Sequence, residues 1–329
     1  MKPAMTRFDR YAAIAREYID QIDYPPVPRA LYDPIRYTMA DGGKRLRPLF
    51  VLGACGLFRD DVSDALPAAA AIEMFHNFTL MHDDIMDNAP LRRGRESVFR
   101  HWGTNVATLA GDELMIYSYR ELAHTHAPIL PAVLEYFNEA AVKVCEGQQY
   151  DMDFEARERV SLAEHIAMIE LKTASLFVGA VSMGAVVAGA SETEVARLRE
   201  FALQFGVAFQ MQDDLLDSYG DARLGKAVGG DILEGKKTYL KMQALAAASA
   251  DDRAELTLIH KDLRYQPAEK ISRVLAIYER YGVRGAVEAE ISRRFEAAAA
   301  ALDSLAGSIR GDRLDELKSF ALSQLGRSK

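Results

Sequence analysis

Residues 73–87 read EMFHNFTLMHDDIMD, an apolar helical pattern that ends in an acidic motif of the form D-D-x-x-D. Residues 209–217, FQMQDDLLD, repeat the motif about 130 residues later, again among apolar residues. Carboxylates are seldom buried without a partner. Two such motifs in apolar helices therefore imply a cation between them and a polyanion that is bound through it.

The spacing within each motif aligns its carboxylates. Residues four apart lie nearly on one line of a helix, so Asp83 and Asp87 face the same way, above Thr79, His76 and Ile72. The second motif follows i, i+3, i+4, i+7, with Gln210, Asp213, Asp214 and Asp217. Oxygen ligands without Cys or His suit Mg²⁺, which completes its shell with water and substrate phosphates, and they also tolerate Mn²⁺. One such motif is commonly a solvated helix face, but two copies followed by cations favour a metal site.

Cationic residues flank both motifs. Residues 42–48 read GGKRLRP, residues 92–95 read RRGR, and Lys226, Lys236 and Lys237 follow the second motif. Arg binds phosphate in a bidentate manner and Lys adds point charge. Arg45 or Lys237 alone would be typical of a surface charge. The alternation of acidic and basic blocks instead predicts a site for two diphosphates, one held through metal and one held directly by cations.

The composition limits the classes of protein that remain. Of the 329 residues, 49% are apolar and 27% charged, as in a soluble globular protein, and the formal charge of −8 argues against a nucleic-acid partner. Cys55 and Cys145 lie among apolar neighbours and are expected to be buried free thiols of a reducing compartment. The N-terminus lacks the apolar core of a signal peptide, and no run, residues 177–190 included, reaches the length of a membrane span. We therefore expect a cytoplasmic protein.

The apolar period is helical almost throughout, which predicts an all-α bundle in a single domain over residues 1–329. Breaks are expected at residues 24–28 and 42–43. The S-x-x-E sequences at Ser161 and Ser191 predict helix starts, and a long buried helix is expected over residues 161–190. The glycine-rich stretch 218–235 predicts a mobile loop.

The motifs GGKRLRP, HDDIMD followed by RRG, Lys172-Thr173, and FQMQDDLLD followed by GKAVGGDILEGKKT resemble those of the trans-polyprenyl diphosphate synthase family in order and spacing, over residues 30 to 245. The resemblance implies the isoprenoid synthase type I fold, a helical bundle around a central cavity, and usually a homodimer. It implies head-to-tail condensation of isopentenyl diphosphate with an allylic diphosphate (dimethylallyl, geranyl or farnesyl). It also implies about three Mg²⁺ ions per site, in keeping with the oxygen ligands.

The resemblance also implies a role for each matching residue. Metal ions that grip the allylic diphosphate would be held by Asp83, Asp84, Asp87, Asp213, Asp214 and Asp217. The same diphosphate would be contacted by Arg92, Lys172, Thr173, Gln210, Lys226 and Lys236. Isopentenyl diphosphate would be bound by Lys44, Arg47, His76 and Arg93. Breaking the allylic C–O bond releases a pyrophosphate, whose charge metal ions and cations stabilise, and the glycine-rich loop before Lys236 would exclude water as a lid.

The chain departs from the family after Arg93-Gly94. Many members have a Pro-Thr pair followed by His, whereas residues 95–99 here read RESVF. The departure lies past the diphosphate ligands, so we expect a different local loop and the same activity. His82 lies about 100° off the metal-facing line, so it is expected to be a packed or supporting histidine.

Product length in this family depends on the fourth and fifth residues before the first aspartate, which form the floor of the chain tunnel. These residues are Phe78 and Thr79, a pair that resembles geranylgeranyl (C20) synthases. Phe75, one turn further down, would tighten the tunnel and favour farnesyl diphosphate (C15). Both phenylalanines could instead simply pack against a neighbouring helix. C20 is the predicted product and C15 the alternative.

Three other classes of protein share some of these features. A class I terpene cyclase would carry an N-D-x-x-S/T-x-x-x-E second site and would not need the cations that bind isopentenyl diphosphate. The non-catalytic subunit of a heteromeric prenyl synthase tends to lose one acidic motif, whereas both are intact here. A purely structural helical protein would leave the ordered cationic blocks unexplained. The sequence therefore favours the prenyltransferase.

Overall fold

The protein is almost entirely helical, which confirms the all-α prediction. A computed structural model describes residues 5–40, 43–220 and 229–325. Among these residues the only strands are β1 (Leu91–Arg92) and β2 (Arg95–Glu96), which form a short antiparallel hairpin.

The chain divides into two compact units, each built from several stretches. Unit 1 takes its described residues from Met1–Ala141, Leu176–Arg199 and Ser304–Leu317. Besides the hairpin it contains α1 (Arg7–Asp20), α2 (Arg29–Ala40), α3 (Leu46–Phe58), the 3₁₀ turn η1 (Ser63–Ala65), α4 (Leu66–Met86), α5 (Val98–Trp102) and α6 (Thr104–Leu122).

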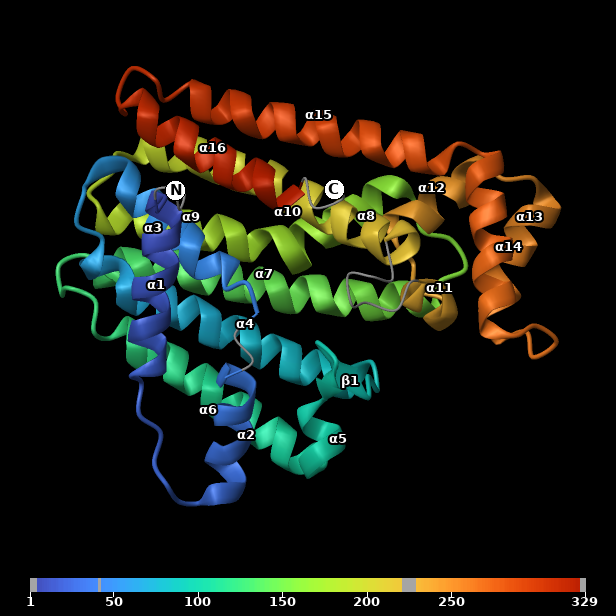
Figure 1. The fold of residues 1–329 in the computed structure, drawn as a ribbon, viewed down its shortest axis with the longest axis horizontal. Coiled ribbons are helices and arrows are strands. Elements are labelled where there is room, and N and C mark those ends of the chain that lie inside the picture. The colour runs from blue at the N-terminus through green and yellow to red at the C-terminus, as the bar shows by residue number, and fades with distance from the viewer. Residues whose placement is uncertain (1–4, 41–42, 221–228, 326–329) are drawn as a thin grey trace. The chain divides into compact units, whose positions relative to one another are not determined.

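Unit 2 takes its described residues from Val142–Ser175, Glu200–Asp303 and Lys318–Lys329. It contains α8 (Leu162–Ile169), α11 (Gly230–Glu234), α12 (Tyr239–Ala247), α13 (Ala250–Leu258), the 3₁₀ turn η4 (Ile259–Lys261), α14 (Pro267–Arg280) and α15 (Val283–Asp303). The residues of four helices are divided between the units: α7 (Leu130–Ala156), α9 (Ser175–Val187), α10 (Glu192–Tyr219) and α16 (Gly311–Leu325). Within unit 2, α14 packs on α11, α12 and α15 (Figure 1). The single domain predicted from the sequence stays a prediction.

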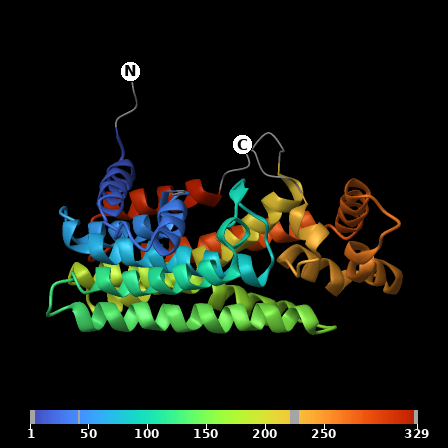
Figure 2. The ribbon, with the colours of Figure 1, turned by 90° about the horizontal axis from the view of Figure 1, so that it is seen from below.

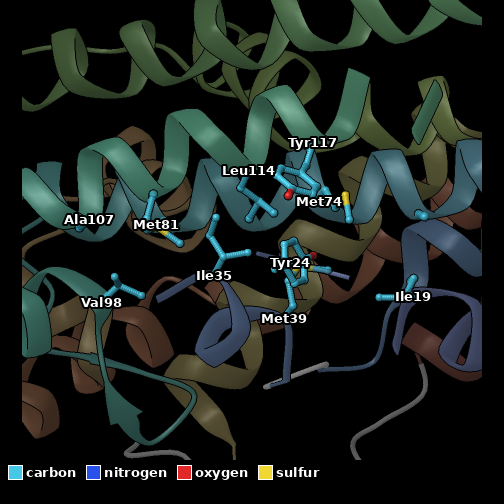
Figure 3. Packing of buried hydrophobic residues seen from close by; sticks show 12 residues of the cluster. Ile19, Tyr24, Ile35, Met39, Met74, Met81, Val98, Ala107, Leu114 and Tyr117 are labelled. Atoms are coloured by element: carbon cyan, nitrogen blue, oxygen red, sulfur yellow. The ribbon is translucent and has the colours of Figure 1, made fainter. Parts of the chain in front are cut away.

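The core of unit 1 orients the first acidic motif. Helices α4 and α6 lie side by side (Figure 1 and Figure 2), and α2 packs on α6. Figure 3 shows Met74 and Met81 of α4 in one apolar cluster with Tyr24 and Tyr117, whose ring centroids are 5.0 Å apart. Burying each such side chain contributes roughly 1.5–3 kcal/mol. Because Met74 and Met81 are two helical turns apart and both are buried, the core holds the rotation of α4 and with it the direction of the motif at its C-terminal end.

Several predicted helix boundaries are confirmed. The side chain of Ser161 accepts a hydrogen bond from the backbone N–H of Glu164, and the Glu164 carboxylate accepts one from the Ser161 N–H, which is a capping box. Ser191 and Glu194 make the same pair of bonds at the start of α10. The predicted break at residues 24–28 lies between α1 and α2. Of the break predicted at residues 42–43, Gly43 lies before α3, and residue 42 lies outside the described residues.

The helix predicted over residues 161–190 contains an irregularity that the sequence did not reveal. Between α8 and α9 the backbone forms a π-helical segment, Glu170–Ala174, which includes Lys172 and Thr173. Such segments are rare and frequently mark functional sites. Gly147 of α7 lies against it so closely that a Cβ there would clash with the backbone nitrogen of Lys172.

The joined helix Leu162–Val187 corrects one expectation. Its 26 residues are long and apolar enough to cross a membrane, although the sequence pattern suggested no run of that length. Of its most apolar window, 61% is buried within the protein, as in the core helix of a soluble protein.

Two further expectations need correction. Neither cysteine is in a disulfide, as predicted, but only Cys55 is buried and Cys145 is exposed on α7. Both described ends of the loop predicted over residues 218–235 contain helix, because α10 continues to Tyr219 and α11 spans Gly230–Glu234. Residues 221–228, on which the predicted lid depends, lie outside the described residues.

Candidate active site

The first acidic motif presents its three carboxylates differently. Asp84 is only 3% exposed, and the Nε of Arg92 donates to its Oδ1 at 2.8 Å, with a second, shorter bond from the same guanidinium. Burial raises the pKa of Asp84 even though the charge of Arg92 opposes this. Asp83 is half-buried and Asp87 is exposed. Asp84 therefore faces a protein partner, while the outer two carboxylates are more accessible.

The hairpin after this motif is a tight turn that carries two of the predicted diphosphate ligands. Arg93 and Gly94 both have positive φ (52° and 79°), as a two-residue hairpin turn requires. Among the described residues, the non-glycine residues with positive φ are Arg45, Asn88 and Arg93. Each adjoins or belongs to a predicted site motif. Backbone strain of this kind concentrates at functional sites.

The cations predicted to bind isopentenyl diphosphate lie in one neighbourhood of unit 1. The Arg93 guanidinium rests on Gly43, where a Cβ would lie 2.8 Å from its Cζ, so a side chain at residue 43 would displace it. Lys44, the next residue, is exposed. The Arg47 guanidinium lies 4.8 Å from the centroid of the Phe177 ring.

Two titratable groups of α4 lie close to these arginines. Burial and then the charges of Arg47 and Arg93 lower the pKa of His76 well below its usual value, so its imidazole is neutral. Glu73, one turn earlier, is 2% exposed, and its burial raises its pKa although Arg47 and Arg93 oppose the shift. A neutral His beside several arginines forms a positive surface suited to an anion.

The second acidic motif lies in unit 2 and is held by neutral groups. Asp214 is 6% exposed, and it accepts hydrogen bonds from the Gln210 amide at 2.8 Å and from the Tyr239 backbone N–H at 3.1 Å. Burial raises the pKa of Asp214 to about 6. Asp213 and Asp217 are half-buried, and an oxygen of Asp217 accepts from the backbone N–H of Asp231 at 3.0 Å.

The other residues predicted for the allylic diphosphate extend this network. The Thr173 hydroxyl donates to the Gln210 carbonyl oxygen at 3.0 Å, so the π-helical segment is tied to α10. Lys172 forms an ion pair with Asp151 at 2.6 Å. Lys236 is exposed and pairs with Glu234 at 3.0 Å. Lys226 lies outside the described residues.

The structure adds residues that the sequence analysis did not single out. Asp231 is mostly buried near Asp217 and Asp214, and burial raises its pKa to about 7. It lies inside the motif GGDILEGKKT, which could have drawn attention to it.

Lys237, which the sequence suggested to be a surface charge, donates to the backbone carbonyls of Phe154 and Arg157 and so ties the start of α12 to the end of α7.

The aromatic residues predicted as the tunnel floor pack against one another in unit 1. Phe75 is buried, and its ring centroid lies 5.3 Å from those of both Phe78 and Phe137. Phe78 is half-buried and also contacts the His82 ring. The Thr79 hydroxyl donates to the carbonyl of His76. His82 packs as expected, with its Nε2 3.1 Å from the Thr108 carbonyl oxygen.

The donor groups of the two motifs fit magnesium. All of them are carboxylate oxygens, which Mg²⁺ prefers. Within the described ranges, no three His, Cys, Asp or Glu side chains form a ready-made metal cluster.

Comparison with known proteins identifies the family. Residues 28–279 match the polyprenyl synthetase family. A short chain isoprenyl diphosphate synthase of Methanocaldococcus jannaschii is 40% identical over 243 residues, which cover 73% of this chain and 72% of that protein. The chain therefore belongs to the polyprenyl synthetase family, and it is a prenyltransferase that makes short-chain prenyl diphosphates.

Solved structures agree with this assignment. A crystal structure of a geranylgeranyl pyrophosphate synthase superposes with a TM-score of 0.92 at 37% identity and covers 99% of this chain and 100% of its own. A geranylgeranyl pyrophosphate synthase of Corynebacterium glutamicum, complexed with isoprenyl diphosphate and magnesium, gives a TM-score of 0.88 at 26% identity, covering 98% of this chain and 100% of its own. The fold is thus that of the geranylgeranyl pyrophosphate synthases, as the sequence motifs suggested.

Proposed function

We propose that the protein condenses isopentenyl diphosphate head to tail with allylic diphosphates in a Mg²⁺-dependent reaction and releases geranylgeranyl diphosphate (C20). The observation that carries the proposal is that unit 1 contains both accessible carboxylates and a group of arginines. Carboxylates at the end of α4 suit a diphosphate held through metal, and the arginines around Gly43 suit one held directly.

For the allylic substrate, we assign the metal to the more accessible carboxylates: Asp83, Asp87, Asp213 and Asp217. Asp84 and Asp214 are then supporting residues, because each is the buried carboxylate of its motif. Bound Mg²⁺ would supply positive charge to the leaving diphosphate. The remaining contacts to that diphosphate are assigned to Arg92, Lys172, Thr173, Gln210, Lys226 and Lys236.

Isopentenyl diphosphate is assigned to Lys44, Arg47, His76 and Arg93. The neutral imidazole of His76 can donate one hydrogen bond to a phosphate oxygen without adding charge. The arginines supply the charge and bidentate geometry. This division leaves the isopentenyl double bond to attack the allylic carbocation after the C–O bond breaks, and a proton is then lost, with the departing pyrophosphate as the proposed base.

Chain length is the finer part of the proposal. Phe75 is buried and its ring packs on that of Phe137, whereas Phe78 is half-buried. A side chain that is only half-buried is better placed to meet a growing chain, which favours Phe78 over Phe75 as the floor and C20 over C15. We further propose that the enzyme is a cytoplasmic homodimer.

Product analysis tests the function. Purified protein is incubated with Mg²⁺, labelled isopentenyl diphosphate and, separately, the C5, C10 and C15 allylic diphosphates. Elongation that stops at C20 is the expected result, and a stop at C15 would transfer the floor to Phe75. Release of pyrophosphate with a hydrocarbon and no elongation would mean a terpene cyclase. No reaction with any starter would favour a non-catalytic subunit.

The tunnel floor is tested separately. Phe78→Ala should lengthen the products, because the floor is lost. Phe137→Ala is the matched control, since it removes an aromatic from the same cluster but outside the predicted floor. An unchanged product profile for Phe78→Ala would exclude Phe78 as the floor.

A further inference from the structure

The hairpin after the first acidic motif carries a third arginine at the point where this chain departs from its family. Arg95 is directly opposite Arg92 in the register of β1 and β2. Like charges opposite each other on a hairpin repel. Arg92 turns to Asp84, whereas Arg95 lies over the ring of Tyr37, with its Cζ 3.7 Å from the ring centroid. The two cations are thus drawn to different partners.

Tyr37 of α2 holds this hairpin in more than one way. Its hydroxyl donates to the backbone carbonyl of Glu96 at 2.9 Å, and its ring lies under the Arg95 guanidinium. The same ring meets Trp102 of α5 edge-on at 5.0 Å. Tyr37 and Arg95 also line a cavity of about 30 Å³ together with Asp84 and Arg92. The hydrogen bond to the Glu96 carbonyl and the cation–π contact with the adjacent Arg95 side chain both join β2 to Tyr37 of α2.

A second point of contact lies at the turn of the same hairpin. Arg93 rests on Gly43, which follows α2, and Lys44 comes next. The hairpin therefore contacts Tyr37 within α2 and also Gly43, which comes after α2 in the chain. Arg93 also has a positive φ, a backbone conformation that persists where the surrounding structure holds it.

We propose that Tyr37 and Arg95 form a clasp that positions Arg93 against the Gly43–Lys44 turn and so sets the affinity for isopentenyl diphosphate. Both are positioning residues, which act through Arg93 without touching the substrate. The inference rests on the proposed function, because that function assigns Arg93 and Lys44 to isopentenyl diphosphate.

The test compares two pairs of variants with a control. Tyr37→Leu removes the ring and the hydroxyl, whereas Tyr37→Phe keeps the ring. Arg95→Gln removes the cation, whereas Arg95→Lys keeps one. Arg100→Gln, at an exposed position of α5, removes a nearby charge outside the clasp. The dissociation constant for isopentenyl diphosphate is measured by calorimetry, and KM for both substrates and kcat by turnover.

Tyr37→Leu and Arg95→Gln should raise both the dissociation constant and the KM for isopentenyl diphosphate about three- to five-fold, as loss of a partly exposed cation–π contact implies, with kcat changed less than about two-fold. The KM for the allylic substrate should change less, because Arg92 keeps Asp84. Tyr37→Phe and Arg95→Lys should recover most of the affinity, and Arg100→Gln should match the wild type.

The clasp is refuted if all five variants bind isopentenyl diphosphate as the wild type does. A proportional loss of kcat and both affinities, together with a lower Tm, would also overturn it by showing a purely structural role. If the wild-type protein binds both diphosphates but never elongates a chain, the proposed function is wrong. The dissociation constants of the variants would still test whether the clasp sets the affinity for isopentenyl diphosphate.

Discussion

The two acidic motifs have the same spacing but are supported by opposite chemistry. In unit 1 the middle carboxylate, Asp84, is held by the charged guanidinium of Arg92 from a neighbouring hairpin. In unit 2 the corresponding Asp214 is held by a neutral amide, Gln210, and by a backbone N–H, that of Tyr239. A repeated sequence motif thus does not carry its own support, and each unit supplies it from different elements.

The two kinds of support predict different effects of substitution on the stability of each motif. A charged partner that is removed leaves a buried carboxylate without compensation, which costs more than the bond itself contributed. A backbone donor is kept in every substitution except one by proline. We therefore expect unit 1 to be the more sensitive to loss of one side chain and unit 2 the more sensitive to changes in backbone packing.

The largest effect should come from the outer aspartates, where the motifs are expected to behave alike. Asp83→Ala and Asp213→Ala should each lower kcat by at least about 100-fold, because positive charge on the leaving diphosphate is lost. Circular dichroism and Tm should show an intact fold. A well-folded variant of either kind that keeps its activity would refute the metal assignment for that motif.

The next effect is on stability and compares one closely packed glycine from each unit, Gly147 of unit 2 and Gly43 of unit 1. Gly147→Ala places a Cβ against the backbone of the π-helical segment, and overpacking of this kind costs about 1–3 kcal/mol. The atoms nearest to a Cβ at Gly43 belong to the flexible end of Arg93, so the cost of Gly43→Ala should be the roughly 1 kcal/mol of a positive φ. Urea unfolding measures both, and equal losses would contradict the contrast.

The partners of the middle aspartates give the next comparison. Arg92→Gln should lower the free energy of unfolding by about 1–3 kcal/mol, because Asp84 stays buried without its charged partner. Gln210→Ala should cost about 1 kcal/mol, because Asp214 keeps the Tyr239 N–H and the Thr173 hydroxyl loses only a neutral acceptor. Chemical denaturation without Mg²⁺ decides between them, and a larger loss for Gln210→Ala would reverse the assignment of support.

The smallest effect depends on pH and concerns the surroundings of Tyr239. His165, 2% exposed, stacks on the Tyr239 ring, and burial lowers its pKa to about 4. The pKa of His165 is lower in the folded protein than in the unfolded chain, so the unfolded chain binds a proton first as the pH falls. The free energy of unfolding therefore decreases between about pH 6.5 and pH 4. Between pH 7 and 5.5 the loss from this group should be about 1 kcal/mol.

The variant His165→Phe isolates that contribution. It should lose less stability than the wild type over the same pH interval, as measured by the change in free energy of unfolding between pH 7 and 5.5. His126→Phe, which replaces an exposed histidine, is the control. Identical pH dependence in His165→Phe and the wild type would show that His165 is not the group responsible.

Much of the fold could be predicted because helical periodicity and capping are local. The boxes at Ser161 and Ser191 depend on residues three positions apart, and the boundaries around residues 24–28 depend on prolines. The π-helical segment at Lys172 could not be predicted in this way. Its close contact is with Gly147, which is 25 residues away in the chain and has no side chain to signal the contact.

For the site, the sequence alone determined which residue types could bind diphosphate and metal, since motif order and charge are written along the chain. Only the tertiary structure decided which of them are accessible. Asp84 and Asp214 have the same chemistry as their neighbours, yet each is the buried carboxylate of its motif and accepts hydrogen bonds from the protein. Burial and partner choice arise from packing between distant segments, such as Arg95 of the hairpin on Tyr37 of α2, and no periodicity within either segment encodes that contact.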